Sequence, residues 1–153
     1  MKIRQILSKN CICSHLESTT KEGILSELAN LLALNYPQIS QDEIAHTLMD
    51  REKLGSTGIG NGIAIPHGKI SSLSQIVTAF GRSLPGVSFE SQDGQPSHLF
   101  FVLLAPENAA SLHLKALARL SRILKDQEFR THLMEAGTEN ELYNAIMSED
   151  DKF

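Results

Sequence analysis

The sequence lacks a long apolar run. Nowhere in its 153 residues is there a stretch approaching the roughly 18 consecutive apolar residues of a membrane-spanning helix. The first ten residues, MKIRQILSKN, hold only a short apolar stretch broken by polar side chains. This differs from the continuous apolar core of a secretory signal peptide. The sequence therefore predicts no membrane insertion.

The sequence also lacks a basic segment. Lysine and arginine total 14 against 18 aspartates and glutamates, which gives a formal net charge of −4. No run of the chain is rich in lysine or arginine, and proteins that bind nucleic acids usually carry such a basic patch. These observations exclude nucleic acid as the main partner.

Cysteine is scarce, with only Cys11 and Cys13 present. Residues two apart on a strand point to the same face, and a disulfide between such close neighbours would be strained. We expect two reduced thiols that face the core, with a redox or metal-binding pair as the alternative. Reduced thiols favour a cytoplasmic location.

The remaining composition is that of a globular protein, with 41% hydrophobic and 21% charged residues. The length suits one domain with its own core. No repeat, low-complexity tract or flexible linker divides the chain. We therefore expect a single domain over residues 1–153.

Two capping signatures precede runs of apolar residues at helical spacing. Thr19 with Glu22, and Ser40 with Glu43, each place a hydroxyl side chain three residues ahead of a glutamate. Each pair predicts the start of a helix. The second helix would carry Arg51 near its end.

Strands are expected on both sides of these helices. A short helical lead-in over residues 1–9 would precede a strand over 10–16, and further strands are predicted at 76–83, 86–91 and 98–106. The last of these, HLFFVLLAP, is apolar almost throughout. Such a run is typical of a strand covered on both faces.

The C-terminal third again predicts helices. Asn108 can cap the first of them, and Thr138 with Glu141 can cap the last. The first of these helices has an apolar stripe made of Leu112, Ala116, Leu117, Leu120, Ile123 and Leu124. Helices thus precede, separate and follow the strands. This order predicts an α/β single-domain sandwich, a small mixed β-sheet flanked by helices on both faces.

A glycine-rich stretch, STGIGNGIAIPHGK over residues 56–69, is the most unusual segment. It fails the dinucleotide pattern, because its glycines are spaced G-x-G-x-G and follow a predicted helix. It also fails the phosphate-loop pattern, because five residues separate Gly62 from Gly68 and Lys69 is followed by Ile70. Neither nucleotide-binding motif is present, and no cofactor is expected.

A metal site has no local support either. The six histidines include no pair spaced as metal ligands on one helix, and no cysteine lies near His67. The simplest interpretation is then a turn between a helix and a strand, with His67 merely exposed. Against it stand four glycines within residues 58–68 and the sequence Pro66-His67-Gly68, which would fix and uncover one imidazole. A turn alone does not require that arrangement.

Two separated segments carry a family resemblance. REKLGSTGIGNGIAIPHGK over residues 51–69 resembles the active-site signature of the enzyme IIA components of the bacterial phosphotransferase system, in their fructose/mannitol-type group. SLHLKALARLSRIL over residues 111–124 resembles the histidine-bearing helix of the same family. The likeness extends through TTKEGIL and LLAPENAA and is strongest to the nitrogen-related branch. The fold of that family is a mixed sheet flanked by helices.

The resemblance implies a phosphohistidine relay. His67 would accept a phosphoryl group on Nε2 from the phosphohistidine of a small HPr-like carrier protein. Arg51 would stabilise the charge of the phosphate, and His113 would orient the ring or stabilise the phosphate. A solvated arginine at a helix end and an ordinary histidine at a helix start remain the alternatives for these two residues. A loop close to the phosphate would contain Ser56, Thr57, Gly58, Asn61 and Gly68.

The other candidate residues receive no such role. Lys69 is expected to be a solvated lysine. The remaining histidines are expected to be structural or exposed: His15, His46, His98 and His132. Apolar residues around the phosphorylated ring would form a docking rim. The candidates are Ile59, Ile63 and Ile65, although some of these three must belong to the core.

Two functions follow from the resemblance. The nitrogen-related branch implies a regulator whose phosphorylation state decides which proteins it binds, with potassium-handling proteins and sensor kinases among the partners. The alternative is a transport component that passes phosphate to a sugar-specific IIB domain. The sequence contains no IIB, HPr or membrane domain, and the closer resemblance to the nitrogen-related branch favours regulation. An interaction module that is never phosphorylated is a third alternative.

Overall fold

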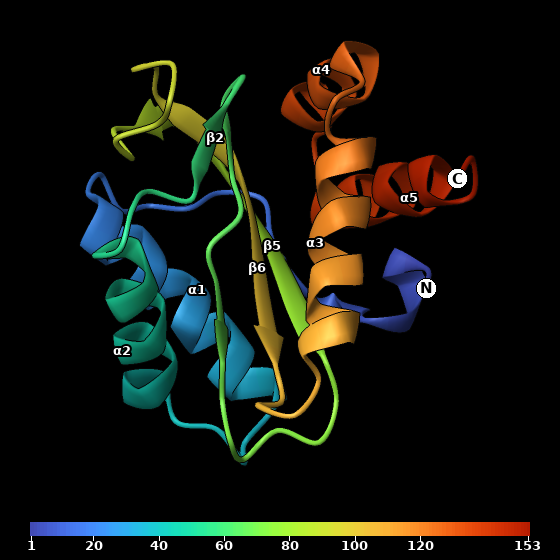
Figure 1. The fold of residues 1–153 in the computed structure, drawn as a ribbon. Helices are drawn as coiled ribbons and strands as arrows, with labels where there is room; N and C mark the ends of the chain where they lie inside the picture. Colours follow the sequence, from blue (N-terminus) through green and yellow to red (C-terminus); the bar gives the residue numbers. More distant parts are fainter.

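The computed structural model describes all 153 residues, and these form one mixed sheet between two layers of helices (Figure 1). The sheet has six strands in the order β1-β5-β6-β3-β2, with β4 also paired to β6. The strands are β1 (Leu7–Cys13), β2 (Gly58–Gly60), β3 (Ile63–Ala64), β4 (His67–Lys69), β5 (Val77–Val87) and β6 (Ser97–Ala105).

Strand β6 lies at the centre of the sheet. It pairs antiparallel with β5 and parallel with β3 and β4. Its residues from Leu99 to Ala105 are all buried, as the apolar sequence of this segment predicts for a strand covered on both faces. The strand gives β4 a rigid neighbour.

Helices α1 (Lys21–Asn35) and α2 (Gln41–Glu52) lie on one side of the sheet, whereas α3 (Ala110–Ile123), α4 (Gln127–Glu135) and α5 (Glu139–Asp150) lie on the other (Figure 1). The predicted α/β sandwich is therefore confirmed. None of these helices is both long and apolar enough to cross a membrane.

The helix starts follow from their caps. The hydroxyls of Ser40 and Thr138 each accept a hydrogen bond of 3.1 Å from the backbone N–H of the residue three positions later in the chain, as predicted. The cap of α1 is Thr20, whose Oγ1 accepts from Gly23 N at 3.0 Å, so the prediction for Thr19 was wrong by one residue. Asn108 does not cap α3, because a turn delays the start of the helix and places Ala109 at the cap.

Several boundaries differ from the predictions. The lead-in is a single 3₁₀ turn over Ile3–Gln5, and β1 begins at Leu7 rather than at residue 10. Strand β5 continues to Val87, so the separate edge strand predicted at 86–91 was wrong. The chain leaves the sheet after Val87, and the ring of Phe89 is fully buried.

Candidate functional site

His67 opens strand β4 and is held by the central strand. Strand β4 pairs parallel with β6, with His67 opposite Leu103, and Pro66 O accepts a hydrogen bond of 2.9 Å from Leu103 N. Because Pro66 also has a restricted φ angle, the backbone at His67 is fixed on both sides. The imidazole is half-buried.

The hydrogen bonds of the His67 ring determine its tautomer. Nδ1 lies 2.8 Å from the carbonyl oxygen of Ile65, which can only accept, so Nδ1 carries the proton. Nε2 accepts a hydrogen bond of 3.3 Å from Arg51 Nε. The ring is therefore a neutral imidazole whose Nε2 lone pair faces the guanidinium of Arg51.

The surroundings of His67 favour the neutral form. Burial lowers its pKa below the usual 6.5 and the charge of Arg51 lowers it further, while the Ile65 carbonyl and the Glu52 carboxylate partly oppose this. A lowered pKa keeps the imidazole unprotonated at neutral pH. A neutral imidazole whose lone pair lies on Nε2 is a nucleophile at that nitrogen.

Arg51 lies in the last turn of α2, as predicted, and is not simply a solvated arginine. While Nε contacts the ring of His67, Nη1 donates a hydrogen bond of 2.9 Å to the carbonyl oxygen of Gly55. The guanidinium is thus held from two sides beside the nucleophilic nitrogen. Its remaining N–H groups are suited to binding an anion there.

His113 lies in the first turn of α3, on the opposite side of His67. The two ring centroids are 5.5 Å apart with planes at 80°, an edge-to-face arrangement. His113 is only 6% exposed, and its buried Nε2 has no hydrogen-bond partner. Burial lowers its pKa most, and repulsion from Lys69 and from His67 when that ring is protonated lowers it further. The structure therefore places a second neutral imidazole beside the ring of His67, and the Nε2 of this second ring lacks a hydrogen-bond partner.

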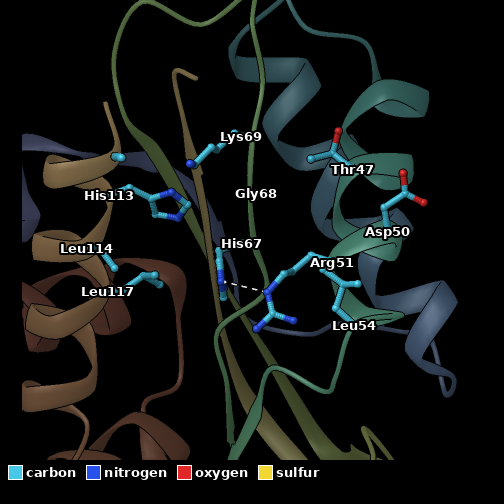
Figure 2. Close-up of a pocket in the computed structure, with 11 residues that line it drawn as sticks. Thr47, Asp50, Arg51, Leu54, His67, Gly68, Lys69, His113, Leu114 and Leu117 are labelled. Atoms are coloured by element: carbon cyan, nitrogen blue, oxygen red, sulfur yellow. Dashed lines mark hydrogen bonds between the residues drawn. The ribbon is translucent and has the colours of Figure 1, made fainter. Parts of the chain in front are cut away.

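These side chains line one cleft of about 510 Å³ between α2, β4 and the start of α3 (Figure 2). Lys69 also lines it, since residues two apart on a strand share a face. The lining residues are Thr47, Asp50, Arg51, Leu54, His67, Gly68, Lys69, Ala110, His113, Leu114 and Leu117. Cationic and imidazole groups outnumber the single carboxylate, so the cleft suits an anion.

The apolar rim of this cleft is not the predicted one. Ile63 and Ile65 are buried in the core, and Ile59 is exposed outside the cleft. The rim instead contains Leu54 and Leu114, which are 84% and 68% exposed. The exposure of Leu114 could have been predicted from the sequence, because this residue falls outside the apolar stripe of its helix. Leu112, which was assigned to that stripe, is exposed.

Four residues of the predicted loop lie outside the cleft, namely Ser56, Thr57, Gly58 and Asn61. The hydroxyl of Ser56 donates to the carbonyl of Phe89, and Asn61 N donates to Asp93 Oδ2 at 3.0 Å. Gly58 N donates to Ser56 Oγ at 3.0 Å, and the N–H and hydroxyl of Thr57 donate to Glu52. These groups build the loop and do not point toward His67.

The glycines of this segment form a tight hairpin. Strands β2 and β3 pair antiparallel across Asn61 and Gly62, whose φ angles are +57° and +78°. Two consecutive residues with positive φ are typical of a type I′ turn, for which Asn-Gly is the preferred sequence. The hairpin therefore explains much of the glycine content without an anion-binding loop.

Gly68 lines the cleft, and close packing explains why this position has no side chain. A Cβ at this position would lie 2.6 Å from Thr47 Cγ2, which no real contact tolerates. The missing side chain therefore allows β4 to approach α2 closely. This approach brings Arg51 within hydrogen-bonding distance of His67.

No group of three or more histidine, cysteine, aspartate or glutamate side chains is arranged to hold a metal ion. Two of the other histidines make local contacts. His98 Nδ1 lies 3.0 Å from the carbonyl of Ser83, and exposed His46 pairs with Asp50 at 3.2 Å.

Comparison with protein families gives one match across nearly the whole chain. Residues 5–149 match the profile of the family described as "Phosphoenolpyruvate-dependent sugar phosphotransferase system, EIIA 2". In structure, the chain is similar to the nitrogen regulatory protein IIA-Ntr from Neisseria meningitidis, with a TM-score of 0.88 and 35% sequence identity. That likeness covers 94% of this chain and 98% of the other.

Two curated relatives represent two kinds of protein. The chain is 40% identical over 146 residues to a nitrogen regulatory protein of Bradyrhizobium diazoefficiens, a match that covers 95% of each. It is 41% identical over 150 residues to the fructose-specific EIIABC component of Bacillus subtilis, covering 98% of this chain. The match spans only 24% of the length of that second relative.

Proposed function

Because the chain belongs to the EIIA type 2 family of the phosphoenolpyruvate-dependent sugar phosphotransferase system, we propose that it is a phosphocarrier whose His67 accepts a phosphoryl group from an HPr-like protein. The observation that carries this proposal is the state of the His67 ring. It is neutral, its proton is fixed on Nδ1, and its Nε2 faces a cationic cleft.

In the proposed step the Nε2 lone pair attacks the phosphorus of the carrier's phosphohistidine. The N–P bond to the carrier breaks, and its electron pair returns to the carrier's imidazole. Positive charge then develops on the ring of His67, where the Nδ1–H bond to the Ile65 carbonyl stabilises it. The reaction is reversible, because one phosphohistidine is exchanged for another.

Arg51 and His113 would supply electrostatic stabilisation of the transferring phosphoryl group. Phosphoryl transfer spreads negative charge over the equatorial oxygens, so catalysis depends mainly on positioning and on nearby positive charge. The Arg51 guanidinium, which donates to Nε2 in the structure, would release that nitrogen and donate to the oxygens of the arriving phosphoryl group instead. The unpartnered nitrogen of His113, across the cleft, would then acquire a partner.

We further propose that the main role is regulatory, as in the nitrogen regulatory relatives. Phosphorylation would place roughly −1.5 to −2 charges in the cleft. A partner docked over the apolar rim of Leu54 and Leu114 would meet that charge at the centre of its interface. Potassium-handling proteins and sensor kinases are the proposed partners, and the free thiols Cys11 and Cys13 fit a cytoplasmic location.

A transport role is the second candidate. It is favoured by the 41% identity to the fructose-specific EIIABC component. In that case the phosphoryl group on His67 would pass to a IIB domain instead of serving as a signal.

Incubation with phosphoenolpyruvate, enzyme I and an HPr-like carrier, followed by intact-mass measurement, tests the proposal. We expect an acid-labile gain of one phosphoryl group that disappears in His67→Ala. No gain with any cognate carrier would refute the phosphocarrier function. Addition of a purified IIB domain separates the two roles, because only a transport component discharges rapidly to it.

A further inference from the structure

Glu52 follows Arg51 directly, yet its side chain points into the protein. Neighbouring helix residues lie about 100° apart around the axis, so Arg51 faces the cleft while Glu52 faces the core. The Glu52 residue is only 7% exposed. Its carboxylate accepts hydrogen bonds from Lys21 Nζ at 2.9 Å, from Thr57 N at 3.1 Å, and from the Thr57 hydroxyl.

The bonds of Glu52 continue to the ring of His67. Glu52 accepts hydrogen bonds from two donors of Thr57, its backbone N–H and its hydroxyl. The carbonyl oxygen of Thr57 accepts a hydrogen bond of 3.0 Å from Ile65 N. The carbonyl of Ile65 in turn accepts the Nδ1–H of His67 at 2.8 Å. A continuous path of hydrogen bonds therefore connects the buried carboxylate with the side of the ring opposite its nucleophilic nitrogen.

The other side of the ring depends on Glu52 through the backbone. Arg51, which donates to Nε2, is the preceding residue in the last turn of α2. The anchoring of Glu52 fixes that turn, and with it the guanidinium. Both hydrogen bonds of the imidazole thus lead back to one carboxylate.

Lys21 extends the network to two further segments. Besides Glu52, its ammonium lies 3.2 Å from Glu90 Oε1 and 4.8 Å from the centre of the Phe89 ring. Glu52 is buried, whereas the side chain of Glu90 is 80% exposed. Two carboxylates therefore share one lysine, but only Glu52 is bonded to the loop that leads to His67.

We propose that Glu52 is a positioning residue, which fixes the His67 tautomer and the approach of Arg51 by holding Thr57 and the end of α2 together. It touches neither the phosphate nor the carrier. This inference rests on the proposed function where it concerns phosphoryl transfer, but the state of the His67 ring can be measured without any transfer.

The test compares Glu52→Gln with Glu90→Gln, which removes the exposed carboxylate on the same lysine. The ¹⁵N chemical shifts of the His67 ring, measured above pH 7.5, report the tautomer. We expect a pure Nδ1–H tautomer in the native protein and in Glu90→Gln, and an added Nε2–H population in Glu52→Gln. The maximal rate of transfer should fall roughly tenfold or more in Glu52→Gln, while the half-saturating carrier concentration stays unchanged.

Two further variants separate positioning from stability. Lys21→Met with Glu52→Gln removes both buried charges, so it should recover the stability lost when Lys21 keeps only the exposed Glu90 as a partner, without recovering the tautomer or the rate. Thr57→Val keeps the shape of Thr57 but removes its hydroxyl donor, and should shift the tautomer in the same direction. This variant decides the question if Glu52→Gln does not fold.

Native ring shifts and a native maximal rate in folded Glu52→Gln would overturn the inference, as would equal changes in Glu90→Gln. Recovery of tautomer and rate in the double variant would also overturn it, since Glu52 would then act through stability alone. If Glu52→Gln does not fold, native shifts in Thr57→Val refute the inference. If the native protein accepts no phosphoryl group, the proposed function fails, while the ring shifts still decide the role of Glu52.

Discussion

Arg51 Nε lies 3.3 Å from His67 Nε2 and donates a hydrogen bond to it, although the two residues are 16 positions apart in the chain. The contact joins the end of a helix to the start of a short strand. It leaves the imidazole neutral, with its lone pair directed at a cation. The proposed phosphoryl acceptor therefore already lies in contact with the guanidinium that would stabilise the negative charge of the phosphate.

Arg51→Ala should lower the maximal rate of phosphoryl transfer by about 100-fold, because a donor aimed at developing charge is lost. Arg51→Lys should recover only part of this rate, since an ammonium cannot bind phosphate through two parallel donors. Single-turnover transfer from phosphorylated carrier measures both. Lys53→Ala, which removes a nearby cation outside the cleft, is the control and should retain the native rate.

His113→Leu should stabilise the protein while impairing transfer. The buried Nε2 of His113 has no partner, and an unsatisfied buried polar atom costs about 1 kcal/mol or more. Urea denaturation should therefore show a higher free energy of unfolding, while the same sample shows slower phosphorylation of His67. A variant that is both less stable and fully active would contradict this account of His113.

Gly68→Ala should destabilise the protein by roughly 1 to 3 kcal/mol, as expected for overpacking. The new methyl group would lie 2.6 Å from Thr47 Cγ2. Thr47→Ser removes that atom, so the double variant should recover most of the loss. Gly137→Ala is a matched control, because its Cβ would come no closer than 3.6 Å to any neighbouring atom. Thermal denaturation of the four proteins tests the packing.

Leu54→Ala and Leu114→Ala should weaken docking without affecting the fold. Both side chains are largely exposed at the edge of the cleft, so each truncation should cost about 1 kcal/mol of binding, or roughly a fivefold rise in the half-saturating carrier concentration. Leu34→Ala removes a side chain that is 73% exposed on α1 and does not line the cleft. It should leave the carrier dependence unchanged.

Stability should decline as the pH falls below about 6.5. Burial lowers the pKa of both His67 and His113 from 6.5, so the unfolded chain binds protons at a pH where the folded protein does not. The contribution of these two groups is complete above 6.5 and is lost as the pH falls toward their folded values. Urea denaturation at pH 7.5, 6.5 and 5.5 measures the slope, which should be smaller in His113→Leu.

The fold was largely predictable, because its main elements carry strong local patterns. The apolar run of β6 and the serine cap of α2 placed those elements correctly. Thr19 and Thr20 are adjacent and chemically alike, so the sequence could not decide which of them caps α1. The boundary at residue 86 was missed because β5 continues through a proline and a glycine without leaving the sheet.

The family resemblance singled out His67, Arg51 and His113, and the structure brings these three side chains to one cleft. The surroundings of each depend on distant parts of the chain. The dipeptide Asn61-Gly62 is typical of a hairpin turn, but nothing in the local pattern shows that this turn lies outside the cleft of His67. Glu52 belongs to the segment that resembles the family signature, but the sequence gives it no role of its own. Only the folded chain connects it with Lys21 and Thr57.

The nitrogen that carries the phosphoryl group is the most direct test of the central claim. Phosphorylated protein labelled with ¹⁵N should show the N–P bond at Nε2 of His67, with the proton retained on Nδ1 toward the Ile65 carbonyl. Long-range ¹H–¹⁵N correlation spectra distinguish the two ring nitrogens. Phosphorylation at Nδ1 of His67, or at any other residue, would contradict the account.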